Sequence, residues 1–217
     1  MAKTPKYQII DFRDALPVNT FRINAGGKIP KRSVKGIQRI VIHCTDDDDK
    51  QGSDIYGLAK YDIGPNHISK HGCYTMTYTY YIESVNNSLK IYHAVDDEVI
   101  TWHVGYWNED SLAIGVDKLA NDKAPDKWTA AVWLSAYLCK RLYLKPKQVV
   151  FHRELERTGW YWREGKKVLR KTCPGMVWDP VKFREDVTLE LLSLNSESTM
   201  ARIINKFFKP RRMGGSK

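Results

Sequence analysis

Short apolar runs, separated by polar segments that contain glycine or proline, predict a series of strands. Residues 38–43 are mostly β-branched, which is typical of a buried strand, and this run ends on His43. Further strands are expected at 74–83, 89–94, 112–118 and 148–151, with the turn signal Asn86-Asn87 joining the first two as a hairpin. The last of these strands delivers His152 at its end, as the first delivers His43.

Helical periodicity is clearest between Asp126 and Leu144. Asp126 can cap this helix, and Lys145-Pro146 stops it, since proline cannot continue a helical ladder. Apolar side chains recur at helical spacing on one face, which predicts packing on the core. They are Trp128, Val132, Cys139 and Leu142.

The two ends of the chain differ in character from its middle. Residues 1–36 are polar and punctuated by proline and glycine, so we expect an N-terminal arm with little regular structure. Pro180 suits the first turn of a last domain helix, with Asp179 as its cap. Residues 195–198 are expected to be a linker and 199–210 a short helix. The expected organisation is therefore an arm (1–36), one domain (37–194) and a linker with a basic amphipathic tail (195–217).

Composition narrows the class of protein. The sequence is 42% hydrophobic and carries a net charge of +10, and residues 201–217 hold six lysines or arginines and no acid. Such a balance favours an anionic polymer or membrane surface as partner, and no motif for specific nucleic-acid binding accompanies it. Four cysteines lack the spacing of a disulfide scaffold, and the first residues lack the apolar core of a secretory signal peptide.

The strongest chemical signal combines two strand-ending histidines with a later cysteine. His43, His152 and the segment Lys171-Thr172-Cys173-Pro174-Gly175 offer two imidazoles and a thiolate. Three such ligands can hold zinc and leave its fourth position for water, the arrangement of a hydrolytic zinc site. A rival chemistry makes Cys173 a nucleophile paired with His152, as in a cysteine amidase or peptidase. That rival leaves His43 and Lys171 without a role.

A family resemblance covers residues 37–178, about two thirds of the chain. It is carried by Ile40-Val41-Ile42-His43-Cys44-Thr45, Tyr78-Thr79-Tyr80-Tyr81-Ile82, His103-Val104-Gly105 with Ser111-Leu112-Ala113-Ile114-Gly115-Val116, and Phe151-His152-Arg153 with the Lys171–Gly175 segment. Together these segments resemble the zinc-dependent N-acetylmuramoyl-L-alanine amidases of the type-2 amidase and peptidoglycan-recognition-protein superfamily, including its T7-lysozyme-like phage endolysins.

The resemblance implies an α/β fold, with a mixed central β-sheet flanked by helices and one zinc ion in a surface groove. It makes His43, His152 and Cys173 the zinc ligands. Four further residues match catalytic or groove positions of the family. Lys171 would stabilise the transition state, Tyr78 would lie near the zinc, His103 would line the substrate groove, and Asp117 stands where some members carry a catalytic glutamate.

The chain departs from the family pattern in three places. Twenty residues separate His152 from Cys173, where the family has a short connection, and this insertion is unusually aromatic. Thr79 replaces a histidine that often follows the family's tyrosine, and Asp117 replaces the glutamate, which leaves the general base open. We expect Trp160 and Trp162 of the insertion, together with Trp102, to bind substrate.

These features predict an amidase that cuts between N-acetylmuramic acid and L-alanine of the peptidoglycan stem peptide, as a phage endolysin does. Without a signal peptide, it would accumulate in the cytoplasm of the host cell and act on the wall after release. Two alternatives stay open. One is a recognition module that binds wall fragments without cutting them, and the other is a cytoplasmic amidase that recycles muropeptides.

Overall fold

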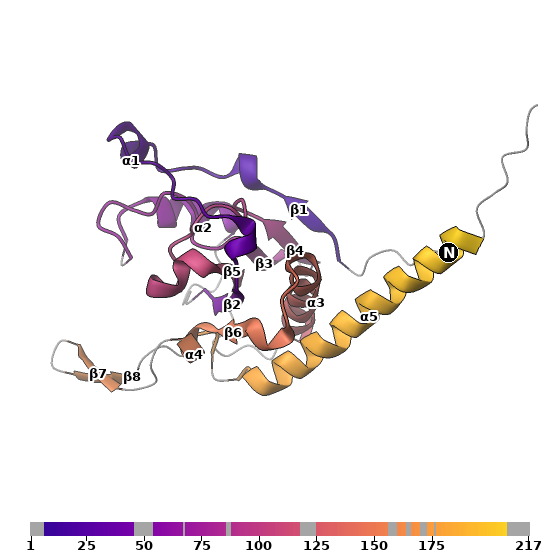
Figure 1. Cartoon of the computed structure of the whole chain (residues 1–217). Coiled ribbons are helices and arrows are strands. Elements are labelled where there is room, and N and C mark those ends of the chain that lie inside the picture. The colour runs from indigo at the N-terminus through magenta and orange to yellow at the C-terminus, as the bar shows by residue number, and fades with distance from the viewer. Residues whose placement is uncertain are drawn as a thin grey trace, which may run out of the picture.

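The architecture is a six-stranded sheet covered by helices on both faces (Figure 1). It comes from a computed structural model that describes residues 7–45, 54–66, 68–85, 88–117, 125–155, 160–163, 166–169, 173–175 and 177–207. For residues 125, 160–163, 166–169 and 197–207, this description is limited to the backbone.

The sheet has the strand order β1-β4-β3-β5-β2-β6. Only the β3–β4 hairpin is antiparallel, and the remaining neighbours run parallel, so the expected mixed sheet is confirmed. The strands are β1 (Ile9–Asp11), β2 (Arg39–Cys44), β3 (Tyr80–Val85), β4 (Ser88–His93), β5 (Ser111–Val116) and β6 (Val149–Phe151). A separate antiparallel hairpin consists of β7 (Trp160–Arg163) and β8 (Lys166–Leu169).

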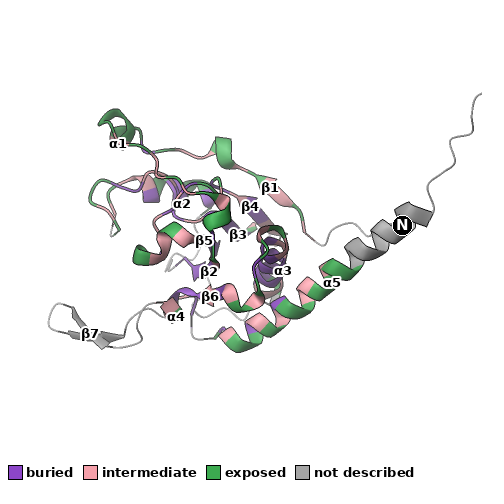
Figure 2. Ribbon diagram, in the orientation of Figure 1, coloured by how far each residue is buried: buried purple, intermediate pink, exposed green. Residues whose placement is uncertain are grey.

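Two apolar clusters form the core, one on each face of the sheet. On one face, Ile42 of β2 and Ile114 of β5 pack with residues of α3 (Pro125–Leu142) and α5 (Pro180–Phe207). On the other, Tyr81 of β3 and Tyr92 of β4 pack with α2 (Ile55–Ile63). The stripe expected on the 126–144 helix does pack on the first cluster. Figure 2 shows the buried sheet and the exposed outer face of α5.

The long C-terminal helix differs from our expectation. Asp179 caps α5 as predicted, since its Oδ1 accepts the backbone N–H groups of Val181 and Lys182, each at 2.8 Å. Residues 195–198, however, are not a linker, because α5 continues through them to Phe207. Ser196 is accommodated by donating its hydroxyl to the Ser193 carbonyl at 2.8 Å. Among the described helices, none is both long and apolar enough to cross a membrane.

The N-terminal arm has more regular structure than its composition predicts. β1 joins the sheet as an edge strand beside β4, and a short helix α1 (Thr20–Asn24) follows it. The helix is capped by Asn19, whose Oδ1 accepts the N–H of Arg22 at 3.0 Å. The Asn19 amide also donates to three backbone carbonyls of the α2–β3 region, which explains how a polar segment becomes ordered.

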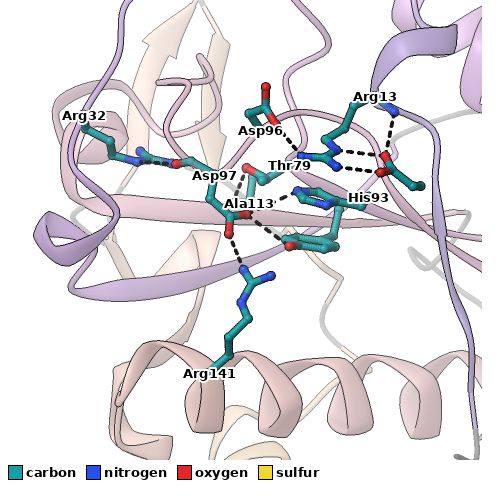
Figure 3. Close-up of polar contacts among 10 residues, drawn as sticks. Arg13, Arg32, Thr79, His93, Asp96, Asp97, Ala113 and Arg141 are labelled. Atoms are coloured by element: carbon teal, nitrogen blue, oxygen red, sulfur yellow. Dashed lines mark hydrogen bonds and ion pairs between the residues drawn. The ribbon is translucent and has the colours of Figure 1, made fainter.

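A polar cluster fastens the loop after β4 to the rest of the domain (Figure 3). The Asp97 carboxylate accepts from Tyr80 at 3.1 Å, lies 3.4 Å from His93, and pairs with Arg141 of α3. Next to it, Asp96 pairs with Arg13 of the arm at 2.6 Å. These contacts tie the arm, the sheet and α3 together on the same side of the molecule.

The strand predicted at 74–83 begins later, at Tyr80. The reason is local, because the backbone N–H of Thr77 donates to the Asp62 carboxylate at 2.8 Å and not to a neighbouring strand. The Thr77 hydroxyl donates to the same oxygen, also at 2.8 Å. A buried aspartate in α2 thus holds residues 74–79 outside the ladder, and Tyr78 among them is directed toward the carboxyl end of β2.

Candidate metal centre

His43, His152 and Cys173 converge near the carboxyl ends of two neighbouring strands, β2 and the edge strand β6. Ile42 of β2 is paired with Phe151 of β6, so the residue that follows each of them in the chain brings its imidazole to the same place. The two imidazole rings have centroids 4.5 Å apart. Both histidines are buried and Cys173 is partly exposed, so the cluster reaches the surface on the cysteine side.

The three side chains offer a donor set that fits zinc. Their ligand atoms all lie within 4.8 Å of one another, and Cys173 Sγ is 3.8 Å from His43 Nδ1. Tetrahedral zinc with these ligands needs separations of about 3.3–3.6 Å, so shifts on the order of 1 Å would complete the site. Two neutral imidazoles and a thiolate suit zinc better than magnesium or calcium, which prefer oxygen.

Cys173 is held by backbone and side-chain donors of its neighbours. The Cys44 N–H donates to Cys173 Sγ at 3.2 Å, and a hydrogen bond of this kind favours the thiolate form. The Arg153 N–H donates to the Cys173 carbonyl at 3.0 Å, and the Arg153 guanidinium donates to the carbonyls of Gly175 and Trp178. Arg153 directly follows His152, so one dipeptide supplies a ligand and fixes the turn that carries another.

His103 is buried and lies in contact with His43. Its Nδ1 is 2.9 Å from His43 Nε2, and its Nε2 is 3.1 Å from Ser111 Oγ. The ring is buried, and this burial, followed by the charges of His152 and Arg32, lowers the pKa of His103 to about 3. The expectation that His103 lines the substrate groove stays a prediction, and the structure adds that its ring is in contact with His43.

Tyr78 lies beside the cluster, as the resemblance implies. Its ring centroid is 5.4 Å from that of His43. Desolvation, and then the charge of Cys173, raise the pKa of Tyr78 well above its ordinary value of 10, so the hydroxyl remains a proton donor at neutral pH. The ring crosses β5 at Gly115, where a Cβ would lie 2.5 Å from Tyr78 Cδ2. Only glycine leaves room for this arrangement.

Asp117 and Trp102 lie at the sides of this region. Asp117 is buried and its Oδ2 is 3.8 Å from Lys127 Nζ, so it has the ion-pair role of a strand-end carboxylate, with a lysine of α3 as partner. It is not one of the three clustered ligands. Trp102 is partly exposed and packs edge-on against Tyr74, and the Arg22 guanidinium lies 5.0 Å from its ring centroid.

Three predicted site residues cannot be placed as side chains. Lys171 lies outside the described residues, and Trp160 and Trp162 belong to β7, whose backbone alone is described. Their roles stay predictions.

Sequence reasoning missed the residues that support the ligands, namely Arg153, Ser111 and Asn108. Asn108 Oδ1 accepts the N–H groups of His103 and Val104 at 3.0 and 2.7 Å, which fixes the backbone that carries the His103 ring. Such contacts leave no pattern in the sequence, because a side chain that binds a main-chain atom does not require a particular residue type as its partner. The only available signal was the position of Arg153 and Ser111 within the quoted family segments.

A family model described as N-acetylmuramoyl-L-alanine amidase matches residues 33–176. The chain is also similar in structure to several solved proteins. LysC, an N-acetylmuramoyl-L-alanine amidase from Clostridium intestinale, is 17% identical, with 85% of this chain and 99% of that one covered at a TM-score of 0.57. The Ph2119 endolysin of a Thermus scotoductus bacteriophage is 20% identical, with coverage of 83% and 99% and a TM-score of 0.52.

A third solved structure, the hydrolase AmiA of Staphylococcus aureus in complex with its ligand, is 14% identical, with coverage of 90% and 87% and a TM-score of 0.56. At these identities, the three likenesses show a shared fold. A comparison with curated proteins gives no match.

Proposed function

Because the chain belongs to the N-acetylmuramoyl-L-alanine amidase family and is a peptidoglycan amidase, we propose that His43, His152 and Cys173 hold one catalytic zinc ion. The bond cut would be the amide between the lactyl group of N-acetylmuramic acid and L-alanine of the stem peptide. The observation that carries this proposal is the convergence of three zinc-type ligands within 4.8 Å, inside the segment that the family model matches.

When bound, zinc would supply a water ionised near neutral pH and a Lewis acid for the amide carbonyl. The residues of the chain supply the rest. Cys44 N–H donates to Cys173 Sγ and so would stabilise negative charge on the sulfur, and Arg153 N–H donates to the Cys173 carbonyl and so supports the turn that positions it. The Tyr78 hydroxyl, protonated at neutral pH, can donate to an oxygen that gains charge during amide cleavage.

Lys171 is proposed as a second donor to that oxygen, on the basis of the family resemblance. In the sequence it stands two residues before Cys173. A fixed cation at a developing oxyanion typically contributes a hundred- to a thousand-fold in rate. Trp160, Trp162 and Trp102 are proposed to stack on sugar rings or stem peptides beside the reacting amide.

The biological setting that we propose is lysis by a phage. The Ph2119 protein, whose fold this chain shares, is described as an endolysin. The protein would accumulate in the cytoplasm of the cell that makes it and would meet the wall after release. Six positive charges without an acid at 201–217 support a contact with anionic wall polymer or membrane surface during that step.

Mass spectrometry of digested peptidoglycan tests the proposal. Purified sacculi should release stem peptides with a free L-alanine amino terminus, while the glycan strands stay intact. A chelator should abolish the release and added zinc should restore it. Binding of sacculi without release would indicate a recognition module, and activity confined to soluble muropeptides would indicate a recycling enzyme.

The matched variant is Cys173→Ser, because hydroxyl is a far poorer zinc ligand than thiolate at neutral pH. It should lose most bound metal and activity while remaining folded. Full zinc occupancy in this variant would contradict the ligand assignment, and so would normal activity in the metal-free protein.

A further inference from the structure

We propose that Ser111, acting through His103, determines which ring nitrogen of His43 is available to the metal, and that Ser111 is therefore a positioning residue of the site. This inference rests on the proposed zinc site. It concerns residues to which the family resemblance assigns no such role, and it starts from a chain of hydrogen bonds that runs from a main-chain carbonyl to the ligand.

The chain has a fixed end. Ser111 Oγ lies 2.5 Å from the backbone carbonyl oxygen of Trp107, and a carbonyl can only accept. The single hydroxyl proton of Ser111 is therefore directed to Trp107. Toward His103, 3.1 Å away, the Ser111 oxygen can offer only a lone pair, so His103 Nε2 must carry a proton and donate it.

The donor-to-acceptor direction of this first hydrogen bond then fixes the direction of the next one, between the two imidazoles. A neutral imidazole has one N–H and one lone pair, so the role of one ring nitrogen fixes the role of the other. With its proton on Nε2, His103 presents the Nδ1 lone pair to His43 Nε2 at 2.9 Å, and His43 must donate there. The lone pair of His43 then resides on Nδ1, the nitrogen that lies 3.8 Å from Cys173 Sγ.

The surrounding segment holds this chain in place. His103 is anchored by Asn108, which accepts two successive backbone N–H groups, and Trp107 belongs to the short helical turn η3 (Gly105–Asp110) that leads directly into Ser111. Arg39 lies over the Trp107 ring at 4.2 Å from its centroid. The direction of the hydrogen bonds to His43 is thus set by the carbonyl of Trp107 in η3 and does not depend on the metal being present.

Nitrogen-15 NMR of the histidine rings tests the proposal on the wild-type protein without metal. We expect both His43 and His103 to be protonated at Nε2, with a free lone pair at Nδ1. A predominant Nδ1-protonated form of His43 would overturn the proposal. This measurement needs no variant, so it remains decisive even if a substitution at Ser111 impairs folding.

Zinc affinity, measured by competition with a chromophoric chelator, gives the second test. Ser111→Ala removes the fixed acceptor, so His103 can reverse and donate to His43, and zinc binding must first undo that arrangement. We expect the zinc dissociation constant to rise about 10- to 100-fold, the usual cost of losing an outer partner of a metal ligand, and the ring signals to show mixed protonation.

Ser135→Ala is the matched control, because Ser135 is equally buried but lies on α3, away from the cluster. It should leave the affinity and the ring signals unchanged. Equal zinc affinity in wild type and Ser111→Ala would overturn the inference while leaving the proposed function intact. Failure of the wild type to bind zinc at all would instead overturn the proposed function, and this inference with it.

Discussion

At the scale of single residues, Gly115 shows how the sheet makes room for the Tyr78 side chain. It is paired with His43 across the β2–β5 ladder, and the Tyr78 ring lies directly over it. A side chain at this position would contact the ring before it contacts anything else. The Ile-Gly-Val segment noted in the sequence therefore owes its glycine to the placement of Tyr78 next to a ligand.

Replacing Gly115 with alanine should displace Tyr78, because the new Cβ would lie 2.5 Å from Cδ2 of the ring. We expect zinc content to be retained and turnover on soluble muropeptides to fall about 100-fold, the scale of a 1 Å misplacement of a catalytic group. Overpacking should also lower stability by about 1–3 kcal/mol. Wild-type turnover in Gly115→Ala would show that the position of Tyr78 is unimportant.

Lys171→Ala should separate metal binding from chemistry. If Lys171 stabilises charge in the transition state, the variant should keep its zinc and lose a hundred- to a thousand-fold in turnover, with little change in KM. Metal analysis and steady-state kinetics on the same preparation make the measurement. Loss of zinc together with activity would assign Lys171 to the support of the metal centre and contradict the proposed role.

Asp62 predicts a specific pH dependence of stability. Burial raises the pKa of Asp62 to about 6, from 3.8. The folded state therefore holds this proton more tightly than the unfolded state, so its contribution is complete below pH 4 and is lost as pH rises through 6. The Asp62→Asn variant has no proton to release at this position, so it does not lose this contribution as pH rises. Relative to wild type, the variant should gain up to about 3 kcal/mol in unfolding free energy between pH 4 and pH 8.

Urea denaturation of both proteins at several pH values makes this measurement. Asparagine can still accept from Thr77 with its Oδ1, so the local hydrogen bonds offer no competing reason for a pH-dependent difference. A difference between the two proteins that does not vary with pH would show that Asp62 titrates normally.

The clustering of His43, His152 and Cys173 could be predicted from sequence, because each residue ends a strand or lies in a distinctive pentapeptide. The surroundings of His103 could not. Its spacing from Gly105 indicates a family position but not whether the ring faces solvent or His43. Ser111 and Arg153 act through main-chain carbonyls, and such partners are fixed only by the fold.

At the scale of elements, the turn after His152 depends on one arginine. The backbone and guanidinium of Arg153 reach three carbonyls between Cys173 and Trp178. The next residue, Glu154, pairs with Arg184 of α5 at 2.9 Å, so α4 (His152–Leu155) links the metal centre to the last helix. The hydrogen bonds of Arg153 thus join the two ends of the 20-residue insertion between His152 and Cys173.

Arg153→Ala should loosen the cysteine ligand. Lost charge-assisted hydrogen bonds cost about 1.5–3 kcal/mol each, so we expect a lower melting temperature and weaker zinc binding. The control is Lys182→Ala, which removes an exposed ion pair with Asp186 and should change stability by less than about 1 kcal/mol. Zinc affinity equal to wild type in Arg153→Ala would show that the turn holds its shape without this side chain.

The starts of elements could be predicted where a simple apolar pattern is buried. They could not be predicted where a hydrogen bond from a polar side chain sets the boundary. β2, β4 and α5 begin within a residue of their expected starts. β3 begins six residues later than expected because Asp62 binds Thr77. Residues 195–198 lack glycine and proline, so their polarity indicates an exposed helical face as readily as a linker, and the helix is what forms.

At the scale of the whole molecule, the mixed sheet with helices on both faces could be predicted from the family resemblance. The edge strand β1 could not, because three residues are too short a run to show a period, and its pairing with β4 and the packing of Ile9 and Ile10 on the core appear only in the fold. The boundary of the catalytic domain at residue 194 stays a prediction. Lys140 of α3 donates to the Leu194 carbonyl at 2.6 Å, which places that residue still in contact with the domain.

This contact allows the basic tail to be removed with the α3–α5 packing left in place. Deleting residues 199–217 should leave activity on soluble muropeptides unchanged and reduce activity on whole cells. Arg202, Lys206, Lys209, Arg211 and Arg212 supply charge, and Ile203, Ile204, Phe207 and Phe208 supply apolar groups suited to an anionic interface. A variant in which only these five lysines and arginines are changed to glutamine keeps the length of the tail. It separates the effect of the charge from the effect of shortening α5.

Because the attraction is between exposed charges, the wild-type advantage on cells should shrink as salt rises from 50 to 300 mM, a range over which the Debye length falls from about 14 to about 6 Å. The glutamine variant should behave like the deletion at low salt and should show little dependence on salt. Unfolding of the truncated protein would mean that residues 199–217 stabilise the domain. An advantage that does not vary with salt would mean that the apolar groups, and not the charges, direct the protein to its surface.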